Sequence, residues 1–402
     1  MLRGKFSNLI SVCFLLAVLC CRVEAATLDL QGTNYAFNPV SIISTSRGFT
    51  LASNSMDNSA GSWEISLSDI DNNFNVTGNW IFTGNKSNTV QKIVALDDGL
   101  ILLGNTSSSE GILKMTESTL QDIIVVRFDE KMRVRWSINL GGHGLNQAHD
   151  ISISRQNGTV TILGWTNESG GEIDDHFGGW DIVVAQYNLD KGELNWVKTL
   201  GGKDDDIAGV LLNVKDSTYV CYNTWSDRHQ WDIKLVQLNK HGRVLWKRTY
   251  GGKGIDLIAK LIYSQKGPII LGSTDSEDFI PTARGEADIF VMGLGKRGKP
   301  IWDVRFGGSH DEIATDIIER NKRLTIIGWS ESNDIDVQNH FGGKDLIVLN
   351  LGIEDHDVHS YSYGTLDDDL PLQFTSMQDQ FYVFGATKVM DKVLQPFLVE
   401  ID

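Results

Sequence analysis

Short runs of apolar residues follow one another along most of the chain, and Gly, Asn, Asp and Ser residues separate them. The runs are rich in β-branched and aromatic residues, as in "TILGWT" and "DIVVAQYN". None of them shows the period of about 3.6 residues that marks an amphipathic helix. The pattern therefore predicts a chain built of β-strands.

A short phrase recurs between these runs: a Trp followed five positions later by a Gly pair. Clear copies read "RWSINLGG", "NWVKTLGG", "LWKRTYGG" and "IWDVRFGG", and weaker copies start at Thr27, Trp80 and His359. An acidic or polar residue follows the Gly pair and precedes a first apolar run. A second apolar run ends in Gly-x-Thr or Gly-x-Ser and is followed by a variable loop. An acidic residue then opens a third apolar run. A four-stranded unit repeated seven times, 50 to 60 residues apart, is typical of a seven-bladed β-propeller.

We therefore predict an all-β fold, a seven-bladed β-propeller of four-stranded antiparallel blades over residues 26–402. The chain ends on a third-strand run, "QPFLVEID", while "ATLDLQG" near its start resembles an outer strand with no blade before it. We expect this N-terminal strand to complete the last blade and close the ring, which would leave no sheet edge exposed there.

The repeated phrase has a structural explanation in this fold. The Trp should lie in the outer strand of a blade and pack against a neighbouring sheet, and the Gly pair should allow a close crossing to the next inner strand. The acid that follows should accept backbone N–H bonds in the turn. The phrase is thus predicted to be mainly a fold signature, since one site would not need seven copies.

The first 25 residues have the plan of a secretory signal peptide: Arg3 and Lys5, an apolar run from Leu9 to Cys21, and a small residue at Ala25. The apolar run is too short to span a membrane. Three of the four cysteines leave with this segment, so the remaining Cys221 cannot form an internal disulfide and is expected to be buried. We expect a secreted, extracellular protein, or a periplasmic one if the source is bacterial.

Removing residues 1–25 takes away three basic residues and one acidic residue, which moves the net charge from −16 to −18. A surface this acidic argues against nucleic acid and anionic membranes as partners. No second long apolar stretch follows, so we expect no insertion into membranes. We also expect a monomer.

Five N-x-S/T sequons occur, at Asn75, Asn85, Asn105, Asn157 and Asn167. They would carry glycans in a eukaryotic secretory pathway and would have no such meaning in a bacterium. The sequence fits both interpretations of the sequons.

The repeat resembles the propeller repeats of surface proteins from Bacteroidetes-type bacteria, and the resemblance covers nearly all of residues 27–402. The stretch "NLDKGELNW" also resembles, in its Gly-to-Trp spacing, the tryptophan-docking motif of quinoprotein propellers and outer-membrane assembly propellers. These resemblances imply the fold and bring no catalytic residue with them.

Motifs for catalysis or cofactors are weak. "GLGKRG" at Gly293–Gly298 matches the dinucleotide pattern but should be a hairpin between two strands. The nine His residues lack metal-ligand spacing, and the acidic clusters Asp204–Asp206, Asp367–Asp369 and "DIDNNFN" from Asp69 resemble solvated loops. We predict no catalytic residue, no metal and no cofactor, with weak calcium binding in a loop as the alternative.

A binding site should lie where the variable loops are. In a four-stranded blade, the loop between the second and third strands and the loop into the next blade emerge on one face, here called the loop face; the opposite face, made of hairpin turns, is called the hairpin face. Binding is expected where loops vary on rigid sheets. The residues expected on the loop face are Trp165, Asp174, Asp175, His176, Trp225, Trp329, Asp336 and His340.

Aromatic rings beside carboxylates suit contact with an extracellular glycan or protein. The sequence "HFGG" occurs before two third strands, and it fits either a structural turn or a shared ligand surface. The leading hypothesis is a secreted, non-enzymatic binding or adhesion protein. The alternatives are an extracellular carbohydrate-active enzyme with carboxylates in the central funnel, and a periplasmic assembly scaffold.

Overall fold

The computed structural model describes residues 25–27, 36–57, 61–114, 120–227, 230–281, 284–377, 380–389 and 393–401. The predicted signal peptide lies outside these residues except for Ala25. The described part contains 28 strands and one short helical turn, η1 (Lys296–Gly298). No helix within it is both long and apolar enough to cross a membrane.

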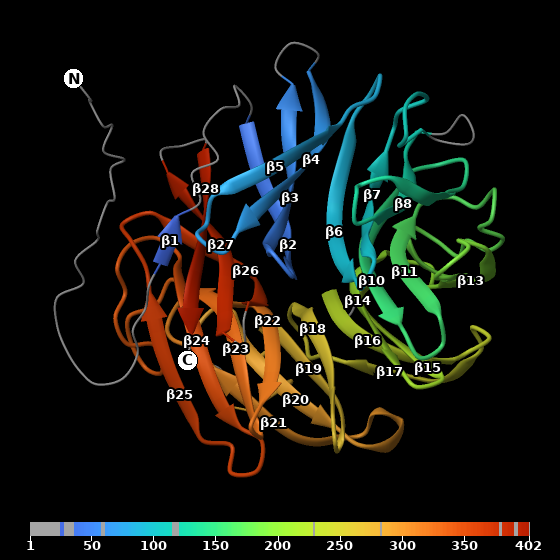
Figure 1. Cartoon of the computed structure of the whole chain (residues 1–402). Coiled ribbons are helices and arrows are strands. Elements are labelled where there is room, and N and C mark those ends of the chain that lie inside the picture. The colour runs from blue at the N-terminus through green and yellow to red at the C-terminus, as the bar shows by residue number, and fades with distance from the viewer. Residues whose placement is uncertain are drawn as a thin grey trace, which may run out of the picture.

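The strands form seven four-stranded antiparallel sheets, which confirms the predicted propeller (Figure 1). The first three blades are β2 (Ala36–Thr45), β3 (Gly48–Asp57), β4 (Ser62–Asp71) and β5 (Val76–Phe82); β6 (Asn88–Leu96), β7 (Gly99–Thr106), β8 (Asp122–Asp129) and β9 (Val134–Leu140); and β10 (Asn146–Ser154), β11 (Thr159–Thr166), β12 (Asp181–Asn188) and β13 (Leu194–Leu200).

The next three blades are β14 (Asp206–Val214), β15 (Ser217–Ser226), β16 (Gln230–Asn239) and β17 (Val244–Tyr250); β18 (Asp256–Ser264), β19 (Gly267–Thr274), β20 (Asp288–Leu294) and β21 (Pro300–Phe306); and β22 (Glu312–Arg320), β23 (Arg323–Ser330), β24 (Asp345–Gly352) and β25 (Val358–Tyr363). The seventh blade has β26 (Asp368–Met377), β27 (Gln380–Val389) and β28 (Val393–Ile401), with β1 (Ala25–Thr27) beside β28. The strand "DIFVMGL" and the hairpin after it contain the Gly293–Gly298 motif, as predicted.

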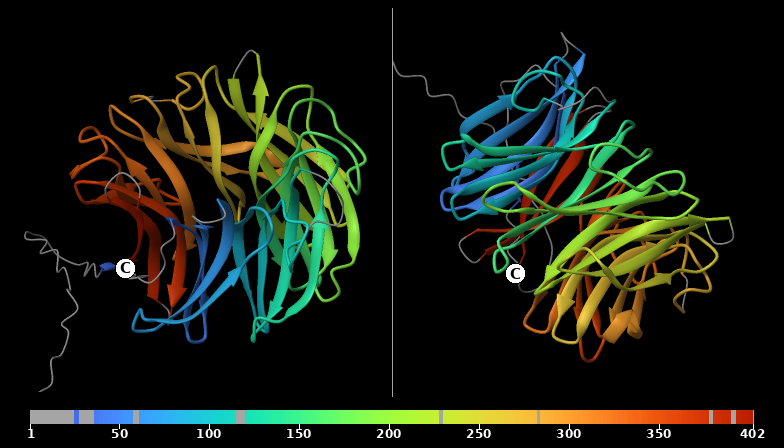
Figure 2. Two further views of the ribbon diagram at one scale, coloured as in Figure 1. Left: turned by 90° about the horizontal axis from the view of Figure 1, so that it is seen from above. Right: turned by 90° about the vertical axis from the view of Figure 1, so that its right-hand side faces the viewer.

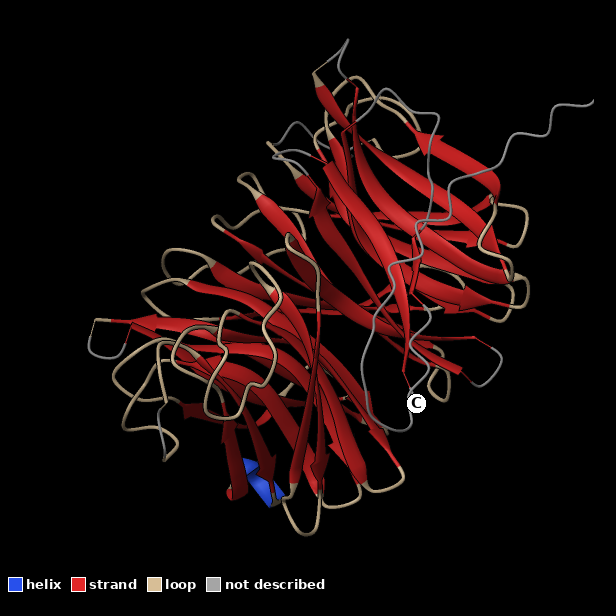
Figure 3. Ribbon diagram, turned by 90° about the vertical axis from the view of Figure 1, so that its left-hand side faces the viewer, coloured by secondary structure: helices blue, strands red, loops and turns tan. Residues whose placement is uncertain are grey.

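The first strand of each blade lies at the centre of the ring, against the first strands of its neighbours (Figure 2). Strands and short connections make up nearly all of the described chain, as Figure 3 shows. The second and third strands are buried on both faces because each sheet is covered by the next one, and every residue of β8 is buried. This double coverage explains the continuous apolar runs in the sequence.

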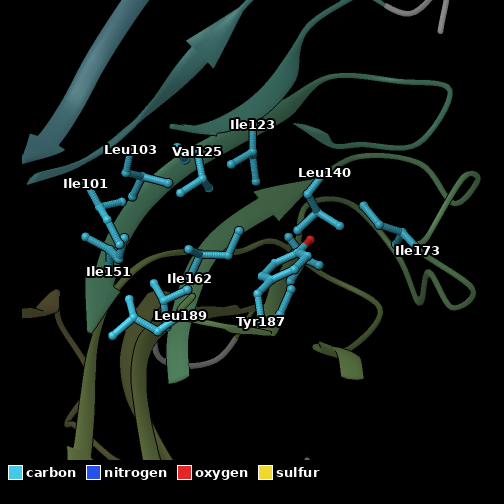
Figure 4. Close-up of a cluster of buried hydrophobic side chains, with 14 residues drawn as sticks. Ile101, Leu103, Ile123, Val125, Leu140, Ile151, Ile162, Ile173, Tyr187 and Leu189 are labelled. Atoms are coloured by element: carbon cyan, nitrogen blue, oxygen red, sulfur yellow. The ribbon is translucent and has the colours of Figure 1, made fainter. Parts of the chain in front are cut away.

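Apolar side chains from adjacent blades interlock to form the core. One cluster joins Ile101 and Val125 of the second blade to Ile151, Ile162 and Tyr187 of the third (Figure 4). Cys221 lies in the equivalent layer between the fourth and fifth blades, and burial raises the pKa of its thiol, as expected for a packing residue.

Every innermost strand contains a β-bulge in its first half, for example between Ala148 and Asp150 in β10. A bulge changes the direction of the side chains beside it. The residues just after the bulge connect neighbouring blades: Lys92 Nζ lies 2.6 Å from Asp150 Oδ1, and Lys260 Nζ lies 3.1 Å from Asp316 Oδ1. The inner ring is thus fastened by ion pairs that the sequence pattern did not predict.

The tryptophans of the repeated phrase reach forward to the next blade. Trp136 Nε1 donates to Leu189 O at 3.0 Å, and Trp196 Nε1 donates to Lys240 O at 3.1 Å. Each ring lies against a turn glycine, Gly192 (φ 70°) or Gly242 (φ 74°), where any side chain would meet the ring. The predicted packing on a neighbouring sheet is confirmed, although the rings are half-buried.

The short strand β1 lies antiparallel to β28, with Ala26 opposite Leu398. It occupies the place that the sequence assigns to the missing outer strand of the seventh blade. Closure of the ring by this strand stays a prediction.

Deleting residues 26–32 should remove this strand and expose the edge of β28. The lost ladder should cost about 2 kcal/mol of unfolding free energy, and the free edge should promote association between molecules. Urea unfolding and light scattering of the chain starting at Ala26, with and without these residues, would measure both effects. An unchanged midpoint and a monomeric product would show that the N-terminal strand does not close the ring.

Candidate functional site

The loop face is built from the described residues that follow the second strands, 107–114, 120–121, 167–180, 227, 275–281, 284–287 and 331–344, and from the Gly-Gly loops between blades. Strand direction places all eight predicted binding residues at this end of the ring. They come from the third, fourth and sixth blades. The residues of the third and fourth blades are neighbours, whereas Trp329, Asp336 and His340 form a separate sector.

The three predicted tryptophans differ in exposure. Trp225, at the end of β15, is 36% exposed and packs edge-on against Trp231 with ring centres 5.4 Å apart. Trp165 is half-buried against His149, 5.2 Å away. The ring of Trp329 lies under Lys344, whose Nζ is 3.8 Å from its centre. Trp225 is therefore the one of the three whose ring is free to meet a partner.

The two "HFGG" segments form the same turn. The N–H of Phe177 donates to Asp181 Oδ2 at 2.6 Å, and the N–H of Phe341 donates to Asp345 Oδ2 at 2.6 Å. His176 Nε2 lies 2.9 Å from Gly179 O, and His340 Nδ1 lies 2.9 Å from Asp345 Oδ2. The structure therefore favours the turn over a ligand surface for the two histidines, which contact their own loops.

In the fifth, sixth and seventh blades, an acid at the start of the first strand holds the entry loop in place. Asp256 accepts the Gly252 N–H at 2.7 Å, the Thr274 hydroxyl at 2.5 Å and the Ser276 hydroxyl at 2.9 Å. Burial raises the pKa of Asp256, although these bonds act against the rise. Glu312 and Asp369 make equivalent contacts. These bonds confirm the predicted role of the acid and explain the Gly-x-Thr ending of the second strands.

In the second to sixth blades, the acid that opens the third strand explains the first Gly of the pair. Asp181 is fully buried, and its Oδ1 packs directly against Gly201, so that a methyl group there would overlap this oxygen. The same relation joins Asp288 to Gly307 and Asp345 to Gly364. The Gly pair was predicted to allow a close crossing of the chain. The group that comes close to the first Gly is a carboxylate.

The acidic clusters are partly structural. In the Asp204–Asp206 triplet, Asp205 Oδ1 accepts the Trp180 N–H at 2.9 Å. Asp368 accepts the Lys344 N–H at 3.2 Å in the same way. In the turn after β4, Asp71 accepts the N–H groups of Asn73 and Asn75 at 2.9 Å, and the bond from Asn75 lowers the pKa of Asp71.

Within the described ranges, no three His, Cys, Asp or Glu side chains come together in a way that could hold a metal ion. The two carboxylates identified after the bulges of the central strands are both paired. Burial alone would raise the pKa of Asp150, but Lys92 and Lys260 lower it below its ordinary value. Asp316 is paired with Lys260. Neither is a free acid of the kind that a glycosidase needs.

A hollow of about 280 Å³ lies on the opposite, hairpin face between the third and fourth blades. Its lining is polar and includes Asn157, Gln186, Asn213, Lys215 and Lys240. The loop face was predicted to bind, so this hollow is a feature that sequence reasoning missed. Its residues come from separate turns and strand ends, which carry no common motif.

The sequon asparagines differ in accessibility. Asn105 is 4% exposed, and its Oδ1 accepts the Ala148 N–H at 2.7 Å, so a glycan there would have to displace an inter-blade bond. The exposed asparagines are Asn75, Asn85, Asn157 and Asn167. They divide between the two faces, with Asn75 and Asn157 in hairpin turns.

Sequence reasoning also missed a set of exposed apolar side chains on the loop face. Phe177 is 49% exposed, Phe341 37%, Ile335 57% and Leu366 88%. Their sequence signal is a single large apolar residue inside a loop rich in Gly and Asp. Phe341 and Leu366 are near each other, because Gly342 lies directly against the backbone of Leu366.

Comparison with known proteins gives the fold alone. No family model matches the chain, and no curated protein matches it. The chain is similar to hydrazine synthase from Kuenenia stuttgartiensis (13% identity, 87% of this chain and 93% of that chain, TM-score 0.52). It is also similar to the β-propeller domain of the Trilobed protease from Pyrococcus furiosus, described as having an open velcro topology (10% identity, 90% and 93%, TM-score 0.51).

BamB from Moraxella catarrhalis matches at 12% identity over 94% of this chain and 98% of that chain, with a TM-score of 0.45. The likeness to the two structures with TM-scores above 0.5 shows the fold alone, and the seven sheets of this chain define its class as a seven-bladed β-propeller. The likeness to surface-protein repeats stays a resemblance, because no family or repeat motif is identified.

Proposed function

We propose that this chain is a secreted, non-enzymatic binding protein whose loop face docks on another extracellular protein. The observation that supports it best is the group of exposed apolar side chains on this face: Phe177, Trp225, Ile335, Phe341 and Leu366. They lie in two sectors, Phe177 and Trp225 on the third and fourth blades and the other three on the sixth blade and its link to the seventh. Large apolar side chains on exposed loops are typical of interaction sites. A rigid ring of sheets holds these loops in place.

A protein partner fits this face better than a glycan does. Ile335 and Leu366 are aliphatic, and they gain most from burial against another apolar surface. Sugars are usually bound by aromatic platforms in a concave site. The polar hollow beside Asn157 lies on the hairpin face instead. The pairing of Asp150 and Asp316 with lysines weakens the alternative of a carbohydrate-active enzyme.

Replacing Phe177 and Trp225 together by alanine should weaken partner binding at least tenfold, the usual cost of truncating central aromatic anchors. Binding would be measured on one array that carries extracellular protein domains and glycans side by side. The control replaces Lys191 and Arg243 by alanine on the hairpin face. Circular dichroism would show that both variants fold.

Binding to protein spots that the loop-face variant loses and the control keeps is the expected result. Equal loss from both variants would reject the loop face as the site. Binding to glycan spots alone would reject the protein partner.

A further inference from the structure

The two faces of the ring carry opposite charge. In the described loop-face segments there are 17 Asp and Glu residues against 6 Lys and Arg residues, a difference of 11. The described hairpin turns hold 9 acidic and 13 basic residues. The acidity of the whole chain is therefore concentrated on the face where binding is proposed.

Four of the six basic residues on the loop face are already paired with acids. Lys203 Nζ lies 3.5 Å from Asp204 and 3.7 Å from Asp227. Lys253 lies 3.3 Å from Asp278. Lys344 lies 3.8 Å from Glu331, and Arg284 pairs with Asp336. These bases do not offset the remaining carboxylates.

One sector of this face is especially acidic. Segment 167–180 of the third blade contains four acids and no base: Glu168, Glu172, Asp174 and Asp175. All four are exposed. Among the residues that the structure describes, none of them has an ion-pair partner. The charge of this segment is thus available to a partner.

Apolar side chains lie within the same sector. Phe177 belongs to the acidic segment, and Trp225 is connected to it through Asp205. The Trp225 N–H donates to Asp205 O at 2.8 Å, while Asp205 Oδ1 accepts the Trp180 N–H at 2.9 Å. The result is an acidic-aromatic patch, defined as Glu168, Glu172, Asp174, Asp175, Phe177 and Trp225.

We infer that the acidic-aromatic patch binds a basic protein surface, one that presents Lys or Arg side chains around an apolar anchor. An apolar centre with a charged rim is the usual composition of a protein interface. The acids attract a basic partner from a distance and repel acidic ones, while Phe177 and Trp225 supply the buried contact. This inference rests on the proposed function and adds the chemistry of the partner.

The probes are three short fluorescent peptides: one of Lys and Leu, one of Lys and Gln, and one of Glu and Leu. Fluorescence anisotropy gives the Kd of each for the mature chain at about 50 mM and about 300 mM salt, because screening weakens exposed charge contacts. We expect the Lys-Leu peptide to bind tightest, the Lys-Gln peptide more weakly and the Glu-Leu peptide not at all.

Two variants test the patch. D174N/D175N and F177A should each weaken binding of the Lys-Leu peptide at least tenfold. The matched control is E130Q/E193Q/L194A on the hairpin face, which makes the same change in charge and truncates an apolar residue that is 45% exposed. The control should change the Kd less than twofold.

An equal effect of the control would show that only the overall charge attracts the peptide, and it would overturn the inference. Binding that D174N/D175N weakens and F177A leaves unchanged would reject the mixed apolar and basic partner. Failure of all three peptides to bind would reject a basic partner, whereas the protein array separately decides whether the loop face binds at all.

Discussion

Replacing Arg305 by leucine should lower the free energy of unfolding by about 3–5 kcal/mol, the usual cost of leaving one member of a buried ion pair alone. Arg305 Nε lies 2.5 Å from Asp288 Oδ2, and neither side chain is exposed to solvent. The guanidinium also donates to the carbonyl oxygens of Ser276 at 2.7 Å and Thr274 at 3.3 Å. The substitution leaves a buried carboxylate without its cation and these carbonyls without their donor. Urea unfolding would measure the lost stability.

The double variant with Asp288→Asn should recover part of this loss, because it removes the uncompensated charge. Arg155→Leu is the control, since Arg155 makes an exposed ion pair with Asp97 at 3.4 Å and should cost less than about 1 kcal/mol. An Arg305 variant as stable as the Arg155 variant would contradict the importance of the buried pair.

Replacing Gly201 by alanine should destabilise the fold by about 3 kcal/mol, the upper range for overpacking a tight site. The added methyl would overlap Asp181 Oδ1, and Asp181 could move only by giving up the N–H bonds from Phe177 and Gly178. The strain is steric, because Gly201 has no positive φ.

Gly202→Ala is the matched control from the same pair. The nearest atom to a methyl at Gly202 would be Asp206 Oδ2, at 3.8 Å, which is an ordinary contact. Thermal unfolding should therefore show a lower Tm for Gly201→Ala and a nearly unchanged Tm for Gly202→Ala. Similar losses at both positions would mean that the backbone conformation, not the carboxylate, requires glycine.

The fold could be predicted from the sequence because the blades repeat the same pattern of strands and turn residues. The Trp five residues before Gly and the acids at two strand starts recur, so each copy supports the interpretation of the others. Trp196 against Gly242 and Asp256 against Gly252 are therefore where the pattern placed them. The repeated pattern predicts these contacts because the face that a strand residue occupies and the hydrogen bonds of a turn depend on nearby residues.

The details of the loop face, where we propose that binding occurs, were harder to predict, since they depend on contacts between loops. Trp165 and Trp329 have the same sequence signal as exposed residues, yet a neighbouring His149 and Lys344 cover their rings. The bulges that bring Lys92 to Asp150 leave no mark in the apolar pattern. Phe177 was passed over because a lone apolar residue in a loop has no period to reveal it.

The forward contact of each tryptophan gives the ring a direction. Trp136 packs against the turn at Gly192 in the blade after it, and Trp196 packs against the turn at Gly242 one blade further on. A piece of the chain made of whole blades would have, at one end, a tryptophan ring without the turn it packs against. At its other end it would have a glycine turn without the tryptophan that covers it. Such pieces are complementary head to tail, so stability resides in the junctions between blades and grows with each one that forms.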